Sequence, residues 1–181
     1  MQELLDALKR DNLVALKKIL ESGKVSPDTK VIIGEEYDLD EPDEVSLLHY
    51  AIQFEVSLDA IEMLVTHGID ITEINRDGLG ALDIAIKYKR MDIVNLCESH
   101  GISLMSSRRK SGMTPLMVAA SFNDFDIVEF LISKGADVNG VDKYGMSAMD
   151  YVKRMGQKKM LEFLQEHGAI QAGLDTLVSQ R

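Results

Sequence analysis

The chain has 181 residues, 45% of them apolar, and a formal net charge of −10. It can therefore bury the core of one domain, while its acidity disfavours a general nucleic-acid or anionic-membrane binder because the mean field repels phosphates. Its one cysteine, Cys97, excludes an intramolecular disulfide and a thiolate metal cluster and predicts a reducing, cytoplasmic setting. The first residues lack the pattern of a signal peptide, and no run has the roughly 18 apolar residues that cross a bilayer.

Helical runs that end in glycine recur along the whole chain. The first ends at Gly23, and four more end at Gly68, Gly101, Gly135 and Gly168, spaced by 33, 34 and 33 residues. Such a glycine ends a helix because the residue after the helix adopts a positive φ. A second landmark marks an earlier, shorter helix in each repeat, at Ala7, Ala51, Ala85, Ala119 and Val152. A period near 33 residues with two helices predicts a stack of helix pairs, because one pair cannot cover its own apolar face.

The fourth repeat carries the strongest family resemblance. It reads Gly112-Met113-Thr114-Pro115-Leu116-Met117-Val118-Ala119-Ala120, then Asp126-Ile127-Val128-Glu129-Phe130-Leu131 and Gly135-Ala136-Asp137-Val138-Asn139. These residues strongly resemble the ankyrin consensus. The resemblance implies an all-α fold, an ankyrin-repeat solenoid of helix-turn-helix units with β-turn or loop tips. We expect one domain over 1–170, with units at about 2–28, 45–74, 78–107, 112–141 and 145–169, and a tail at 171–181. The tail is either a short docked helix or frayed, and we favour the docked helix.

One family tetrapeptide, Thr-Pro-Leu-His, is poorly kept. The corresponding segments are 46–49, 80–83, 114–117 and 147–150, of which only the first keeps His, as His49, and only the third keeps Thr-Pro. We therefore expect some of the usual hydrogen bonds between neighbouring units to be missing. Polar residues suit the first and last units as end caps, for example Lys17 and Lys18 in the first and Lys158 and Lys159 in the last.

An acidic insertion at 29–44 separates the first two units. Seven of the ten residues from Glu35 to Glu44 are acids. A solvated surface loop is one interpretation, and a recognition or self-shielding segment is another. The spacing fails for an EF-hand calcium loop, because Pro42 falls at the fifth position and Asp43 replaces the required glycine.

The sequence supports no catalytic or metal site. His67, His100 and His167 recur before their glycines, but stacked helices lie about 8–10 Å apart, too far for two imidazoles to share one Zn²⁺. We interpret them as helix-end residues that complement the helix dipole. Cys97 lies within an apolar helix and is expected to be buried and unreactive. With no phosphate loop and no serine elbow, we predict a protein that is not an enzyme and uses no cofactor.

The predicted binding surface lies on the first helices and the tips, which line the concave face in ankyrin arrays; this is what the resemblance implies. Three residues after the landmarks Ala51, Ala85, Ala119 and Val152 stands an aromatic residue or Met, whereas the first unit has Arg10 there. The residue just before this position is basic in three units, as Lys9, Lys87 and Arg154. A basic residue also precedes the end of each tip. The candidate partner-binding residues are Phe54, Tyr88, Phe122, Met155, Lys87, Arg154, Arg76, Lys110, Lys143 and Tyr144. Such residues are typical of interface hot spots, although the aromatic ones could instead pack on the neighbouring unit.

Two classes of function remain open. The first is a monomeric protein–protein interaction module or adaptor that binds a partner, possibly one with an acidic segment that carries apolar anchors. The alternative is a dedicated accessory, chaperone-like or inhibitory, of one partner enzyme, as small ankyrin proteins of bacteria can look like. A metal- or haem-handling protein is a third, poorly supported class. We expect no binding of nucleic acid or membranes.

Overall fold

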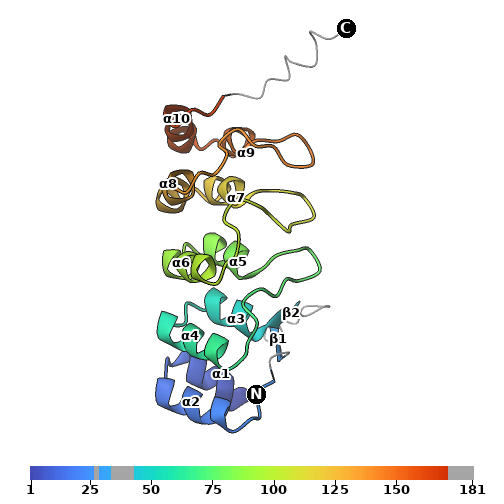
Figure 1. The fold of residues 1–181 in the computed structure, drawn as a ribbon, viewed down its shortest axis with the longest axis vertical. Coiled ribbons are helices and arrows are strands. Elements are labelled where there is room, and N and C mark those ends of the chain that lie inside the picture. Colours follow the sequence, from blue (N-terminus) through green and yellow to red (C-terminus); the bar gives the residue numbers. More distant parts are fainter. Residues whose placement is uncertain (27–28, 34–42, 171–181) are drawn as a thin grey trace. The chain divides into compact units, whose positions relative to one another are not determined.

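The computed structural model describes residues 1–26, 29–33 and 43–170. Within these ranges the helices come in pairs, a shorter first helix followed by a longer second one. The pairs are α1 (Gln2–Lys9) with α2 (Leu13–Glu21), α3 (Leu47–Gln53) with α4 (Leu58–Thr66), α5 (Ala81–Lys87) with α6 (Met91–Ser99), α7 (Pro115–Ser121) with α8 (Phe125–Ser133), and α9 (Ala148–Arg154) with α10 (Lys158–Glu166) (Figure 1).

The chain divides into two compact units. Unit 1 comprises Met1–Arg76 and Gly80–His100, and so contains α1 to α6. Unit 2 comprises Asp77–Leu79 and the chain from Gly101 on, with α7 to α10. In unit 1 α3 packs against α5, and in unit 2 α7 packs against α9. Each unit therefore stacks its own first helices upon one another, as the repeat pattern predicts.

The landmark alanines lie where first helices pack. Ala51, Ala85, Ala119 and Val152 are completely buried, because a small side chain lets neighbouring helices approach closely. The second helices contribute the larger core side chains, such as Ile61 and Leu64 in unit 1 and Ile127 and Leu131 in unit 2. Burial of each such side chain contributes about 1.5–3 kcal/mol, so stability comes chiefly from packing between helices of seven to nine residues that would not form alone.

The glycine landmarks end the second helices as expected. Gly23, Gly68, Gly101, Gly135 and Gly168 all have φ between 68° and 96°. The residue before three of them is the predicted histidine. His67 and His167 each place Nδ1 2.8 Å from the carbonyl oxygen four residues earlier, that of Met63 and Phe163 respectively. The interpretation of these two histidines as helix-end residues is confirmed.

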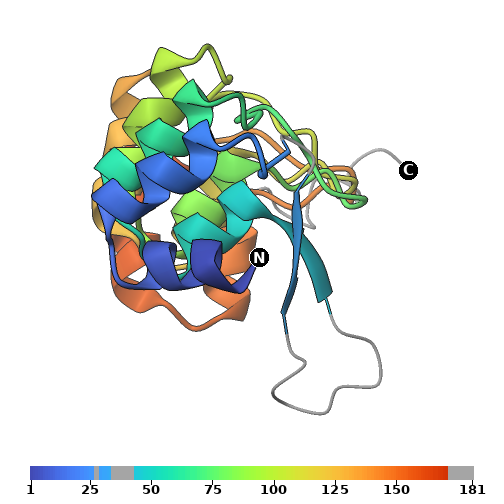
Figure 2. The same ribbon diagram turned by 90° about the horizontal axis from the view of Figure 1, so that it is seen from below.

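A two-stranded sheet in unit 1 was not predicted. Strand β1 (Lys30–Ile33) pairs antiparallel with β2 (Asp43–Ser46), with Val31 opposite Val45. Both strands contact α3, and Figure 2 shows them extending outward beside the helices of unit 1. Their β-branched residues favour a strand, a signal that the acidic composition of the insertion obscured. Most of the acidic stretch and the tail 171–181 lie outside the described residues, so the expectations for them stay predictions.

The altered tetrapeptides make hydrogen bonds within their own repeat. The Asp83 carboxylate accepts from the Gly80 N–H at 2.9 Å, and Asp150 accepts from the Ser147 N–H at 2.9 Å. Asp150 therefore completes a capping box with Ser147, whose hydroxyl oxygen accepts from the Asp150 N–H at 3.3 Å, whereas Gly80 has no side chain and only the Asp83 half of the box forms. Neighbouring pairs are joined by other groups instead, such as Ser57 Oγ, which donates to Asp11 at 2.6 Å.

Candidate protein-binding surface

The four apolar residues predicted to bind a partner occupy one structural position. Phe54 and Tyr88 in unit 1, and Phe122 and Met155 in unit 2, are each the C-cap residue of a first helix. We call these four residues the apolar column. Phe54 is 43% exposed, Phe122 40% and Met155 55%, while Tyr88 is half-buried. The column therefore offers large apolar side chains at the bend between the two helices of each pair.

The bend has the same backbone conformation in each pair, because the residue after each column residue adopts a left-handed φ. Glu55, Lys89 and Asn123 have φ of 54°, 56° and 55°, and Gly156 has φ of 69°. The N–H two residues after each column residue then donates to a carbonyl of the first helix, as Val56 does to Ala51 at 3.0 Å. The column side chains consequently leave fixed backbone positions, which lowers the entropy lost on binding.

In unit 1 the column residues also make contacts within the protein. The Phe54 ring lies 4.4 Å from the buried Tyr50 ring, centroid to centroid, and Lys9 Nζ lies 5.8 Å from the Phe54 centroid. Lys87 Nζ is 5.3 Å from the Tyr88 ring. Phe54 thus packs partly on its own helix and partly beneath a residue of the preceding pair. Packing on the neighbouring unit, one of the two sequence interpretations, therefore describes part of what this side chain does, while 43% of it stays exposed.

In unit 2 one glutamine joins the two bends that carry the column. Gln157 Nε2 donates to the Ser121 carbonyl oxygen at 2.8 Å and lies 3.8 Å from Met155 Sδ. Ser121 directly precedes Phe122, so this bond holds the bend after α9 against the end of α7. It brings Met155 close to the bend that carries Phe122, and Arg154 is exposed beside them.

The basic tip residues lie apart from the apolar column. Lys110, Lys143 and Tyr144 in unit 2 precede the N-termini of α7 and α9, whereas the column residues follow the C-termini of these helices. A seven-residue helix is about 10 Å long. In unit 2 the basic tip residues are therefore separated from the column by about the length of a helix. Arg76 is exposed at the equivalent tip position in unit 1.

Within unit 2 the tips are stacked through main-chain hydrogen bonds. The Lys110 N–H donates to the Asp77 carbonyl oxygen and the Lys143 N–H to the Ser111 carbonyl oxygen, both at 3.1 Å. Gly78 makes the first contact possible, because a Cβ there would lie 2.0 Å from the Arg108 carbonyl oxygen. The two tips before α7 and α9 project to the same side, away from α8 and α10 (Figure 1).

Asp142, which the sequence analysis did not select, organises the tip before α9. Its carboxylate is 6% exposed and accepts from the N–H groups of Tyr144 at 2.8 Å and Met146 at 2.9 Å, and from the Tyr151 hydroxyl. Burial raises the pKa of Asp142, but these hydrogen bonds outweigh burial and lower it overall. Burial and the same contact raise the pKa of Tyr151 to about 12. The equivalent tip positions hold Asn75 and Arg109, so a comparison of repeats could have identified this difference.

His49 is a buried titratable residue of unit 1. It is 6% exposed on α3, near Glu73, Lys30 and Asp83, and Lys30 forms an ion pair with Glu73. Desolvation by burial lowers the pKa of His49 from 6.5. Lys30 acts in the same direction, while the two carboxylates oppose them. His49 is therefore held in its neutral form in the folded chain.

This burial predicts a pH-dependent stability. Because the folded pKa of His49 is below the unfolded value, the unfolded chain binds more protons as the pH falls below about 6.5. The wild-type free energy of unfolding should therefore fall below pH 6.5 relative to that of His49→Gln. Urea unfolding of both proteins from pH 8 to pH 5 measures this. A constant difference between the two proteins across that range would contradict the prediction.

The described residues offer little for metal or nucleophilic chemistry. No group of three or more His, Cys, Asp or Glu side chains among them could hold a metal ion. Cys97 is buried, and desolvation raises its thiol pKa to about 12. It is therefore protonated and unreactive at neutral pH, which confirms the expectation from sequence.

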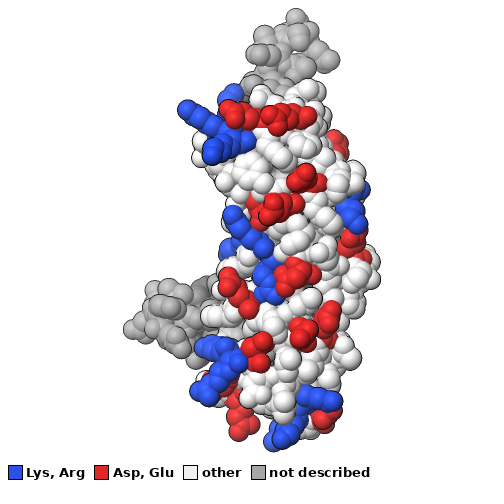
Figure 3. All heavy atoms as spheres, turned by 90° about the vertical axis from the view of Figure 1, so that its left-hand side faces the viewer, with Lys and Arg blue, Asp and Glu red and all other residues white. Residues whose placement is uncertain are grey.

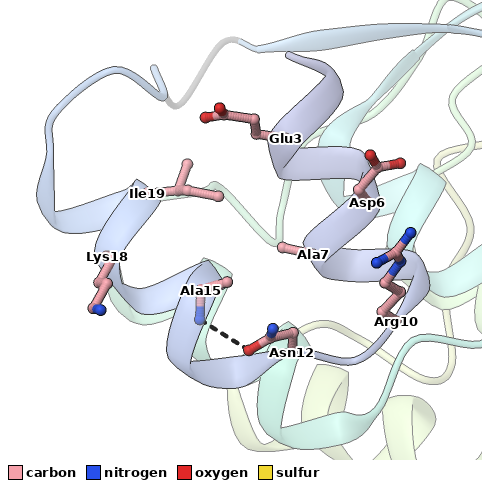
Figure 4. Close-up of a pocket in the computed structure, with 8 residues that line it drawn as sticks. All are labelled: Glu3, Asp6, Ala7, Arg10, Asn12, Ala15, Lys18 and Ile19. Carbon is pink, nitrogen blue, oxygen red and sulfur yellow. Dashed lines mark hydrogen bonds between the residues drawn. The ribbon is translucent and has the colours of Figure 1, made fainter.

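Two other surfaces of the described chain differ from the column and the tips. On the face formed by the second helices, acidic and basic side chains are interspersed in each unit (Figure 3), so that face presents no field of a single sign. A hollow of about 400 Å³ lies between α1 and α2, with Ala7, Ala15 and Ile19 at its base and both signs of charge around it, Glu3 and Lys18 among them (Figure 4). Residues equivalent to Ala15 and Ile19 are buried in every other pair, so this hollow is the face of the first pair that no other described pair covers.

These features define a protein built from stacked helix-turn-helix repeats. The chain matches a family model described as ankyrin repeats (3 copies), once over residues 4–107 and again over residues 100–173. It therefore belongs to the ankyrin-repeat family. That match consists of ankyrin repeats, and no catalytic domain is identified in it. None of the helices in the described residues has the length and apolar content needed to cross a membrane.

Relatives of varied kinds share the repeats. The chain is 35% identical over 107 residues to alpha-latrocrustotoxin-Lt1a of Latrodectus tredecimguttatus, covering 54% of this chain and 7% of the toxin. It is 27% identical over 110 residues to glycerophosphocholine phosphodiesterase gde1 of Schizosaccharomyces pombe, covering 61% and 10%. It is 28% identical over 97 residues to the NF-kappa-B inhibitor cactus of Drosophila melanogaster, covering 52% and 19%. The chain thus spans less than a fifth of each relative.

Proposed function

We propose that this chain is a protein–protein interaction module, an adaptor that binds a partner protein through its first helices and tips and acts by surface complementarity. Ankyrin repeats generally mediate protein binding. The observation that carries the proposal is the apolar column, in which Phe54, Phe122 and Met155 are 40–55% exposed at one recurring position. Exposed aromatic and Met side chains with neighbouring Arg are the composition of interface hot spots.

The partner in this proposal is a protein with an acidic segment that carries apolar anchors. Lys87 and Arg154 directly precede Tyr88 and Met155 and are exposed, so cations flank apolar anchor positions in both units. The net charge of −10 disfavours nucleic acids and anionic membranes as partners. We propose that the module is monomeric, cytoplasmic and free of cofactors.

Replacing the aromatic members of the column tests this function. The variant Phe54→Ala, Tyr88→Ala, Phe122→Ala should keep its helical circular dichroism, because the C-cap hydrogen bonds come from the backbone N–H groups of these residues, which alanine retains. It should lose its partner in affinity purification from the source cells, measured by quantitative mass spectrometry. The matched control is Val14→Ala with Ile170→Ala, which removes exposed apolar side chains outside the column.

The outcome separates the two classes of function. One or more proteins recovered by the wild type and the control, but not by the column variant, would support the adaptor. A single enzyme recovered in the same molar amount as the wild-type bait, with its activity changed by the bound chain, would instead support a dedicated accessory. Recovery of the same proteins by all three baits would contradict a role for the column.

A further inference from the structure

We infer that the stacked tips of unit 2 bind a short acidic segment of the partner, in which an apolar residue adjoins the acids. This inference rests on the proposed function and deepens it, since it assigns the acidic part of the partner to the tips. We call the surface the cationic strip; it consists of Arg108, Lys110, Lys143, Tyr144 and Val141.

The strip is built on a rigid backbone. The Lys110 and Lys143 N–H groups each donate to a carbonyl oxygen of the preceding tip at 3.1 Å. The two hydrogen-bonded tips therefore run close together, at roughly the 5 Å separation of bonded strands. The Lys143 Cγ lies close to Gly112, 3.1 Å from where a Cβ would stand. Lys110 and Lys143 thus start from neighbouring, fixed positions, a spacing suited to carboxylates along one extended segment.

The acid nearest to Lys143 is withdrawn from this surface. The Asp142 carboxylate accepts three hydrogen bonds, from the N–H groups of Tyr144 and Met146 and from the Tyr151 hydroxyl, and is 6% exposed. Its oxygens are therefore occupied within the fold, while Lys143 and Tyr144 next to it are exposed. The tip consequently presents the cation and the aromatic ring outward and its acid inward.

One exposed acid does adjoin the strip. Asp77 Oδ1 lies 3.4 Å from Lys110 Nζ, and both side chains are 72% exposed. An ion pair this exposed is worth little, so a carboxylate of the partner can replace Asp77 at small cost. Arg108 adds a further exposed cation to the same tip.

The charge of the whole chain favours a protein segment over other anions. A small cationic strip on a molecule of charge −10 attracts a short acidic stretch locally, while extended polyanions and anionic bilayers meet the repulsive mean field. Tyr144 is 75% exposed and Val141 53%. Tyrosine is enriched at protein interfaces because its ring is apolar and its hydroxyl polar, and here it lies beside the cations. The segment should therefore carry an aromatic or aliphatic residue next to its acids.

A direct binding assay tests the strip. The probe is a fluorescein-labelled peptide of alternating Glu and Ser with one Phe, and its control has Lys in place of each Glu. Fluorescence anisotropy should show that only the Glu peptide binds, and more weakly as salt increases. Lys110→Glu with Lys143→Glu should weaken binding by about tenfold or more, because carboxylates then meet like charges. The control Lys158→Glu with Lys159→Glu on α10 changes the net charge by the same amount. Its affinity for the Glu peptide should stay within about twofold of that of the wild type.

Several results of these binding assays would overturn the cationic strip. No binding of the Glu peptide, or equal weakening by both charge variants, overturns the strip, as does equal binding of a DNA duplex or of phosphatidylserine vesicles. Tyr144→Ala should weaken the Phe-containing peptide and leave a peptide without Phe unchanged; no difference would contradict the apolar part. The triple column variant should bind the peptide like wild type, so failure of the strip is distinguishable from failure of the column.

Discussion

Gly78→Ala should lower the free energy of unfolding by about 2–5 kcal/mol. Two costs add at this residue. The φ of Gly78 is 78°, in the left-handed region that disfavours any Cβ by about 1–2 kcal/mol. The new Cβ would also stand 2.0 Å from the Arg108 carbonyl oxygen, a backbone atom that can move only with its tip, and such overpacking costs about 1–3 kcal/mol. Urea denaturation followed by circular dichroism measures the loss.

Gly145→Ala is the matched control for this prediction. Gly145 has a similar φ of 74°, but a Cβ there would meet no atom within 4 Å. Its substitution should cost only about 1–2 kcal/mol, the cost of the left-handed backbone. Equal losses in the two variants would show that the close approach of Gly78 to the next tip contributes nothing. The difference between them therefore isolates the packing of one tip on another.

Asp142→Ala should destabilise the protein by about 2–3 kcal/mol. The substitution leaves two main-chain N–H groups and the Tyr151 hydroxyl without their acceptor, and hydrogen bonds to a charged group contribute about 1.5–3 kcal/mol. Tyr151→Phe removes one of the three bonds and should cost about 1 kcal/mol. If Tyr151→Phe cost as much as Asp142→Ala, the main-chain bonds of the tip would carry no weight.

The lowered pKa of Asp142 adds a pH signature to the same residue. A carboxyl group with a folded pKa below its unfolded value of 3.8 stabilises the fold above that value, and the stabilisation is lost as the pH falls through the folded pKa. Acid unfolding of the wild type should therefore lose a contribution below about pH 4 that Asp142→Asn lacks. Denaturant curves at pH 7 and pH 3 give the difference in free energy of unfolding between wild type and Asp142→Asn at each pH. Equal differences at the two pH values would contradict a lowered pKa for Asp142.

The repeat architecture could be predicted from sequence because it depends on local rules that recur. A helix that ends at Gly68 and again at Gly101 needs the same left-handed backbone each time, and the landmark alanines mark the same close approach of helices. The hairpin of β1 and β2 was missed for the opposite reason. The hairpin occurs once in the chain. No second copy therefore shows that the short run Val31–Ile33 is a strand distinct from the acidic residues after it.

The candidate surface could be predicted only in part. Exposure of Phe54, Phe122 and Met155 follows from their place at a helix end, which the repeat fixes. The distance between the column and the tips could not be predicted in this way, because it depends on which end of the first helix each residue occupies. Asp142 was missed because its importance comes from Tyr151, nine residues away, and from burial that composition does not reveal.

The left-handed residue at each bend has an evolutionary consequence. Glycine is the least strained residue at such a φ, yet Glu55, Lys89 and Asn123 stand where the last bend has Gly156. Each adds a side chain immediately beside a column residue, at a cost of about 1 kcal/mol. A substitution at one of these bends changes the side chain next to Phe54, Tyr88 or Phe122. It leaves the period of the repeat unchanged. The bends are thus positions where a substitution can alter the surface beside the apolar column independently of the repeat architecture.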